Sequence, residues 1–198
     1  MIEPSVFNNE QELLKAIIEL HCPNGKVELD PMYFKGNFYK EIPKPDYTYD
    51  INPEQANDEF VRGGDATNLH WIKDTSIMNE ILDPPFMFGI HGKTEQYYSS
   101  RTHGIFKDFK ELTELYKGIL KEAYRILKKQ GVLIFKCQDY TDSKTTMIHC
   151  LVYNWATELG FYAKDLAILH LPKNKIYNPN LTQRHLRKTH SYFWVFRK

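Results

Sequence analysis

The chain has 198 residues, of which 42% are apolar and 26% are charged, and its formal net charge is +1. This balance excludes a disordered or fibrous protein and predicts a single domain over residues 1–198 with a buried core. No apolar stretch approaches the ~20 residues that span a bilayer, and the N-terminus lacks the features of a signal peptide. We therefore expect a cytoplasmic protein without a membrane partner.

Metal-binding patterns are missing from the sequence. The eight histidines show no ligand spacing, and the cysteines lie too far apart for a zinc or disulfide framework: Cys22, Cys137 and Cys150. We therefore expect no metal ion, and we expect the thiols to be reduced and partly buried.

The N-terminal part of the chain predicts one helix followed by four short strands. Apolar residues recur at helical spacing from Asn9 to Leu20, and Pro23-Asn24-Gly25 is a stop signal. Strands are predicted at residues 27–30, 47–50, 59–66 and 78–82. Each of these strands ends at or next to an aspartate.

The C-terminal part alternates helices and strands. A helix is predicted over 109–129, closed by Lys128, Lys129 and Gly131, and a second helix over 143–159, which stops at Gly160. Further strands are predicted at residues 132–136, 167–169 and 192–196. This alternation predicts a three-layer α/β sandwich around a mostly parallel sheet.

Acidic residues close four successive strands of this predicted sheet. In open α/β sheets, ligands bind outside the carboxyl ends of the strands. The spacing of Asp50 after the first strand suits an acid that accepts hydrogen bonds from ribose hydroxyls, and Asp65, followed by Ala66, could bond an adenine amino group. One aspartate at a strand end is common in turns, but four in order predict a nucleotide site: Asp30 with Pro31, Asp50, Asp65 and Asp83.

The fourth acid begins the tetrapeptide Asp83-Pro84-Pro85-Phe86. The carboxylate and the Pro84 carbonyl can each accept a hydrogen bond from an amino group, and the Phe86 ring can stack on a flat heterocycle. The alternative is that two prolines only terminate a strand. The tetrapeptide resembles the (Asp/Asn/Ser)-Pro-Pro-(Tyr/Phe/Trp) motif of S-adenosylmethionine-dependent amino-methyltransferases, which methylate exocyclic nitrogens of bases in DNA or RNA.

The wider chain resembles the class I (Rossmann-like) methyltransferase fold, and within it the small phage- and prophage-type DNA methylases. The segments that carry this resemblance are Leu29–Pro31, Lys35–Tyr39, Phe135–Asp139 and His190–Trp194. The resemblance implies a seven-stranded sheet with an antiparallel C-terminal strand, and S-adenosylmethionine as the cofactor.

The first loop departs from the glycine-rich form that is usual in this fold. Met32-Tyr33-Phe34-Lys35 occupies it, and Gly36 stands alone. We expect Tyr33 or Phe34 to pack on the cofactor and Lys35 to meet its carboxylate. The alternative is a crowded pocket that binds the cofactor weakly.

Two segments are predicted to hold nucleic acid. Residues 87–106 combine glycines with basic and aromatic residues, among them Tyr97, Tyr98 and Arg101. The segment from Pro172 to His190 contains no acid and carries several cations, including Arg184, Arg187 and Lys188. The alternatives are a surface lid and an ordinary solvated loop.

The predicted reaction is in-line methyl transfer to an amino nitrogen, with adenine N6 in DNA favoured over cytosine. Asp83 and the carbonyl of Pro84 would turn the nitrogen lone pair toward the methyl group, and Phe86 would stack on a flipped or single-stranded base. RNA bases remain an alternative, as do a protein glutamine, a small molecule and a catalytically silent binding fold. The sequence does not indicate an oligomeric state.

Overall fold

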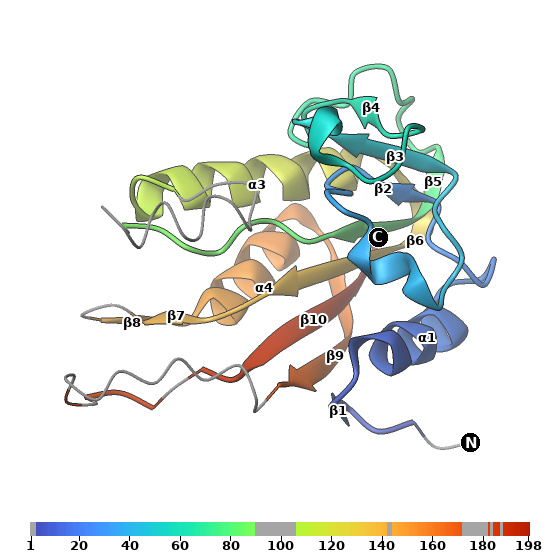
Figure 1. Cartoon of the computed structure of the whole chain (residues 1–198). Coiled ribbons are helices and arrows are strands. Elements are labelled where there is room, and N and C mark those ends of the chain that lie inside the picture. Colours follow the sequence, from blue (N-terminus) through green and yellow to red (C-terminus); the bar gives the residue numbers. More distant parts are fainter. Residues whose placement is uncertain (1–2, 90–105, 142–143, 172–181, 183, 187) are drawn as a thin grey trace.

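The computed structural model describes residues 3–89, 106–141, 144–171, 182, 184–186 and 188–198. Within these ranges one mixed sheet has eight strands in the order β1-β9-β10-β6-β5-β2-β3-β4 (Figure 1). Its strands are β1 (Val6–Phe7), β2 (Leu29–Asp30), β3 (Tyr47–Asp50), β4 (Arg62–Gly63), β5 (Ile77–Leu82), β6 (Leu127–Cys137), β9 (Tyr162–His170) and β10 (His190–Arg197).

The α-helices are α1 (Glu10–His21), α3 (Phe109–Ile126) and α4 (Ile148–Leu159), and the 3-10 helices are η1 (Asn37–Lys40) and η2 (Pro53–Gln55). A small hairpin joins β7 (Tyr140–Thr141) to β8 (Thr145–Thr146). No helix in the described part of the chain is long and apolar enough to cross a membrane.

The sheet is parallel except at β10, which runs antiparallel to both β6 and β9. The mostly parallel sheet and its antiparallel C-terminal strand are therefore confirmed. Among the described residues the sheet has eight strands rather than seven, because β1 adds two residues in parallel to β9, with Val6 opposite Ile168. A segment of two residues is too short to show an alternating pattern in the sequence, so β1 could be recognised only from its pairing with β9.

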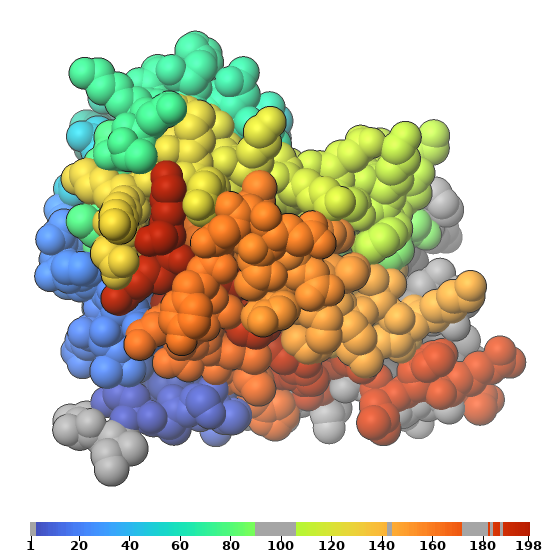
Figure 2. Space-filling model, turned by 180° about the vertical axis from the view of Figure 1, so that it is seen from behind, coloured from blue at the N-terminus to red at the C-terminus, as the bar shows by residue number. Residues whose placement is uncertain are grey.

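Helices cover both faces of the sheet. Alternate residues of β6 separate the two cores: Val132 and Ile134 pack with α1 and η1, whereas Leu133 and Phe135 pack with α3 and α4. The view from behind shows α4 (orange) beside α3 (yellow-green) over that second face (Figure 2). The predicted three-layer α/β sandwich is confirmed.

Helix α1 follows its prediction closely. The Asn9 side chain caps it by accepting a hydrogen bond from the Gln11 amide at 2.8 Å. Its buried stripe contains the predicted apolar residues, and it ends one residue later than predicted: Leu13, Leu14, Ile17 and Ile18 are buried, and the last helical residue is His21.

The predicted end of the long helix is wrong. Helix α3 stops at Ile126 rather than at residue 129, because Leu127 already pairs with Ile77 in the sheet. The last carbonyls of the helix are bonded by amides of the 75–76 loop, so the basic residues and glycine that follow do not cap it. They lie in the long strand β6 instead, where Gln130 adopts a positive φ of 66°.

Two other boundaries also differ. Helix α4 begins at Ile148 rather than at residue 143, because threonines of the 140–146 segment pair in the β7–β8 hairpin. Its predicted stop at Gly160 is confirmed, since that residue is left-handed at φ 104°. The third predicted strand shortens to β4, which ends two residues before Asp65.

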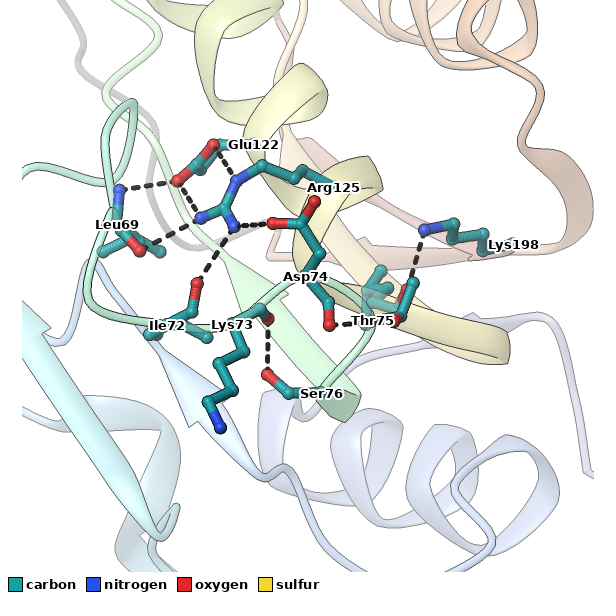
Figure 3. A network of polar contacts seen from close by, with 10 residues as sticks. Leu69, Ile72, Lys73, Asp74, Thr75, Ser76, Glu122, Arg125 and Lys198 are labelled. Carbon is teal, nitrogen blue, oxygen red and sulfur yellow. Dashed lines mark hydrogen bonds and ion pairs between the residues drawn. The ribbon is translucent and has the colours of Figure 1, made fainter.

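Arg125 fastens the loop that leads into β5 (Figure 3). Its guanidinium pairs with Glu122 and Asp74 and donates to the carbonyls of Leu69 and Ile72 at 3.0 and 2.9 Å. Glu122 in turn accepts the Leu69 amide at 2.6 Å. This network holds the 69–74 loop against the C-terminal turn of α3, and thus steadies the start of β5.

Candidate functional site

A cavity of about 330 Å³ opens at the carboxyl ends of β2, β5 and β6. Aromatic rings and charged groups share its wall. Its lining residues are Glu10, Asp30, Met32, Tyr33, Phe34, Lys35, Asn37, Phe38, Tyr39, Asp83, Pro84, Pro85, Phe86, Lys136, Cys137, Gln138 and Ser191. The structure thus brings all four residues of the Asp-Pro-Pro-Phe tetrapeptide to one site with Asp30 and the first loop.

The tetrapeptide follows directly on the last residue of β5, as predicted. Tyr116, fully buried in α3, donates a hydrogen bond from its hydroxyl to the carbonyl of Pro85 at 3.2 Å. This bond anchors the loop at its second proline, not at Pro84, whose carbonyl is the predicted acceptor. Phe86 is half-buried against the core beneath α3.

Lys136 lines the cavity, as the predicted Lys35 does, but the sequence analysis did not select Lys136 as a site residue. Its ammonium lies 3.0 Å from Asp83 Oδ2 and 3.0 Å from Glu10 Oε1. It also lies over the rings of Phe38 and Phe193, with centroids at 4.7 and 5.6 Å. Burial alone lowers the pKa of Lys136, but the two carboxylates outweigh it and raise that pKa above its ordinary value.

A lysine directly after the buried apolar run Val132–Phe135 was the available signal for Lys136. Glu10 gave no such signal, because it lies in the first turn of α1, where acids are common for helix-dipole reasons. Only the packing of α1 against the sheet brings Glu10 to the cavity.

Asp30 is buried, with 3% of its surface exposed. Its carboxylate accepts the Tyr39 hydroxyl at 2.6 Å and the Met32 amide at 2.9 Å. Burial raises the pKa of Asp30 to about 7, although both hydrogen bonds act in the opposite direction. Asp30 therefore titrates near neutral pH at the wall of the cavity.

Aromatic stacking shapes the first loop. Tyr33 stacks on Tyr39 with ring centroids 5.3 Å apart and an interplanar angle of 6°. Gly36 has a positive φ of 65°, and a Cβ there would lie 2.5 Å from the Tyr33 hydroxyl oxygen. Both the left-handed backbone at this position and the nearby Tyr33 side chain thus require glycine. Pro31, at the start of the loop, is buried.

Several predicted cofactor residues lie outside the cavity lining: Pro31, Gly36, Asp50, Asp65 and Ala66. Asp50 is buried and accepts the amides of Phe34 and Asn52, both at 2.8 Å. Asp65 is exposed and bonds Thr67, and the neighbouring Ala66 is buried. The Asp50 carboxylate therefore contacts the first loop by accepting a backbone amide of that loop. The contacts with the cofactor that we expect for Asp50, Asp65 and Ala66 stay predictions.

The predicted nucleic-acid residues are described only in part. Tyr97, Tyr98, Arg101 and Arg187 lie outside the described residues. The ends of the 87–106 segment meet beside the tetrapeptide, where the amide of residue 106 donates to the carbonyl of residue 87 at 3.0 Å and the amide of residue 89 donates to the carbonyl of residue 106 at 3.0 Å.

Arg184 is exposed and Lys188 is half-buried, between the ends of β9 and β10. His170 pairs with His190, and Tyr192 pairs with Cys137, which lines the cavity. The connection from β9 to β10 therefore leaves and re-enters the sheet at the edge that carries the cavity. The β7–β8 hairpin projects from the same side of the molecule (Figure 1).

No group of three metal-ligating side chains that could hold a metal ion occurs within the described ranges. The expectation of a metal-free site stays a prediction.

Comparison with known proteins identifies related sequences and folds. Residues 80–198 match the N6/N4 methyltransferase family, which is described as DNA methylase. No curated protein matches the sequence. A methyltransferase from Archaeoglobus fulgidus, described as SAM dependent, is 17% identical over 97% of this chain and 96% of its own, with a TM-score of 0.54. This likeness shows the fold.

A candidate DNA modification methylase from Thermus thermophilus is 18% identical over 68% of this chain and 52% of its own, with a TM-score of 0.47. The same protein complexed with S-adenosyl-L-methionine is 18% identical, with a TM-score of 0.45. The chain spans about half the length of this relative.

Proposed function

The chain belongs to the DNA methylase family, and from that premise we propose that it transfers a methyl group from S-adenosylmethionine to an exocyclic amino nitrogen of a nucleic-acid base. Adenine N6 in DNA is the favoured acceptor. The observation that carries the proposal is the position of Asp83–Phe86, which follows β5 directly and lines the cavity beside Asp30 and Lys136.

The cavity suits the cofactor in size and chemistry. At about 330 Å³ it falls within the range of small-molecule sites, roughly 300–1,000 Å³. Aromatic faces and carboxylates both attract a sulfonium cation, and the cavity offers both in Tyr33, Phe38, Asp30 and Asp83. Bound S-adenosylmethionine supplies the electrophilic methyl group.

The residues of the chain act by positioning the acceptor. Asp83 and the Pro84 carbonyl accept the two N–H bonds of the amino group, which turns the nitrogen lone pair away from them. Phe86 stacks on the base. When the nitrogen gains the methyl group it gives up one proton, which Asp83 is placed to accept, while the ion pair with Lys136 holds the carboxylate in position.

Nucleic acid as the substrate class is supported by the family match and by the cations on the connection between β9 and β10. Arg184 and Lys188 lie on the connection that enters the sheet beside the cavity, where phosphates would bind them. We extend the proposal to a phage- or prophage-type methylase, on the sequence segments described above, and to a cytoplasmic location, because the three cysteines are unpaired thiols.

The test is transfer of labelled methyl groups from S-adenosylmethionine to duplex DNA, single-stranded DNA and total RNA, followed by nucleoside mass spectrometry. We expect N6-methyladenine in DNA, and a loss of at least about a hundredfold in kcat for Asp83→Ala, which removes the acceptor oxygens. Asp46→Ala is the matched control, because Asp46 is an exposed carboxylate paired with Lys26 on the surface.

The other outcomes are equally informative. Label on RNA alone would reject DNA as the substrate. Cofactor binding without label on any nucleic acid would reject the nucleic-acid substrate and favour a protein or small-molecule amide. Neither binding nor transfer would leave a catalytically silent fold.

A further inference from the structure

A second cluster of reactive groups lies at the N-terminal turn of α4, outside the cavity lining. The Sγ of Cys150 is 3.3 Å from Nε2 of His149, and Nδ1 of His149 is 2.7 Å from Oδ1 of Asp139. The thiol contacts the imidazole, and the imidazole contacts the carboxylate. These are the separations required of a nucleophile, its base and the group that orients the base.

Asp139 is built to orient the imidazole. It is buried, with 4% of its surface exposed, and its Oδ1 also accepts the backbone amide of His149 at 3.2 Å. A carboxylate only accepts hydrogen bonds, so Nδ1 of His149 carries the proton and Nε2 presents its lone pair to the thiol. The geometry therefore selects the tautomer that can take the Cys150 proton.

Tyr192 packs against the face of the His149 imidazole. Its ring stacks on that of His149, with centroids 4.1 Å apart and an interplanar angle of 18°. Its hydroxyl bonds Asp139 Oδ2 at 3.4 Å and His190 Nε2 at 2.9 Å. His149 is therefore fixed by stacking as well as by hydrogen bonds, which reduces the freedom that a surface histidine usually keeps.

The other two cysteines provide an internal contrast. Cys22 and Cys137 are buried, and burial raises the pKa of both thiols, that of Cys22 to about 12. Neither has a histidine partner among the hydrogen bonds that the structure describes. Cys150 is the exposed one of the three, and it lies in the first turn of its helix, where the dipole favours a negative charge.

We infer that Cys150 is an activated nucleophilic thiol, a site of covalent modification by peroxides and other small electrophiles. His149 Nε2 takes the thiol proton, and the sulfur attacks one oxygen of hydrogen peroxide. An S–O bond forms as the O–O bond breaks, and the departing hydroxide takes the proton from His149 to give water. Sulfur is oxidised to the sulfenic acid, and the peroxide is reduced.

Cys22 and Cys137 are both buried, so neither presents an exposed thiol to the sulfenic acid. The modified residue would therefore persist until a small thiol in solution reacts with it. The cluster stands two residues beyond the cavity-lining Cys137 and beside Ser191, which also lines the cavity, so modification would occur at the same edge of the sheet.

The test measures the alkylation rate of each cysteine in the full chain by iodoacetamide at neutral pH, with mass spectrometry to assign the site and glutathione as the free-thiol reference. We expect Cys150 to react at least about tenfold faster than glutathione, since general-base assistance contributes up to about 10²–10⁴. Dilute hydrogen peroxide followed by dimedone should label the same residue and no other.

Variants test whether His149 is responsible for the alkylation rate of Cys150. His149→Gln should lower the Cys150 rate to that of glutathione, and Asp139→Asn should lower it in part, whereas His70→Gln, an exposed histidine elsewhere, should leave it unchanged. Reaction at the buried Cys22 would report unfolding of any variant. A wild-type Cys150 rate no higher than that of glutathione would overturn the inference, as would an unchanged rate in a folded His149→Gln. The measurement is independent of methyl transfer.

Discussion

Replacing Lys136 by methionine removes the ammonium group that lies between two carboxylates at the cavity. Glu10 and Asp83 each lie 3.0 Å from this ammonium and would then face one another without a cation. Methionine keeps most of the length and apolar volume of the side chain, so the packing against Phe38 and Phe193 is retained. The substitution therefore tests charge rather than shape.

The structure sets the size of the effect. Losing one partner of a fully buried ion pair costs roughly 3–5 kcal/mol, whereas an exposed pair contributes about 0–1 kcal/mol. The Lys136 side chain is 20% exposed, but those of Glu10 and Asp83 are 26% and 38% exposed, so water can solvate the carboxylates in part. We expect Lys136→Met to lower the free energy of unfolding by about 2 kcal/mol.

Urea unfolding measures this change, and Lys15→Met is the matched control. Lys15 lies in α1 and pairs with Glu41 at 2.6 Å, but the two side chains are 43% and 53% exposed. Its loss should cost less than about 1 kcal/mol. Methyl transfer by Lys136→Met should fall by at least about tenfold, because Asp83 loses the group that holds its Oδ2.

A second set of variants distinguishes the effect of unpaired carboxylates from a nonspecific loss of packing. In the Lys136→Met background, Glu10→Gln together with Asp83→Asn removes the unpaired carboxylates and should restore part of the lost stability. The reasoning would be refuted if Lys136→Met lost no more stability than Lys15→Met, or if neutralising both carboxylates in that background lowered stability further.

Three further predictions can be checked by urea unfolding. Burial raises the pKa of Asp30 to about 7, above the ~3.9 of an unfolded chain, so its contribution to stability is full below about pH 4 and is lost as the pH rises to about 7. Asp30→Asn should remove this slope between about pH 4 and pH 7, and an unchanged slope would count against the assignment. Gly25→Ala, at φ 64° with nothing within 4 Å of the new Cβ, should cost about 1 kcal/mol. Gly36→Ala should cost at least twice as much, because its Cβ would lie 2.5 Å from the hydroxyl oxygen of the buried Tyr33; equal costs would reject the clash. Arg125→Met should cost about 2–3 kcal/mol by leaving loop carbonyls without donors, whereas Lys110→Met at an exposed helix pair should cost under about 0.5 kcal/mol, and similar losses would show that the Arg125 network contributes little.

Much of the architecture follows from short-range patterns. The apolar stripe and the Asn9 cap determine α1, and the alternation of strands and helices determines the layers. The Asp-Pro-Pro-Phe tetrapeptide marks the edge of the sheet at which the cavity lies. Each of these signals is contained within a window of a few residues, where backbone geometry and side-chain burial depend on near neighbours.

Boundaries that depend on distant partners were not predictable in this way. The basic residues after Ile126 have the composition of a helix end, but pairing of Leu127 with Ile77 draws the segment into the sheet. The two residues of β1 become a strand only beside β9. In both cases a hydrogen-bonding partner far away in the sequence overrides the local preference.

The same distinction holds for the site and for the second cluster. The sequence by itself determined the layer order, the acids at the strand ends and the tetrapeptide, because these depend on local periodicity and turn chemistry. Only the tertiary structure placed Glu10 against Lys136, which are 126 residues apart, and set Tyr192 over His149 beside Asp139. Such contacts depend on the order of strands in the sheet and on the face that each helix covers, and neither is encoded in any short stretch of chain.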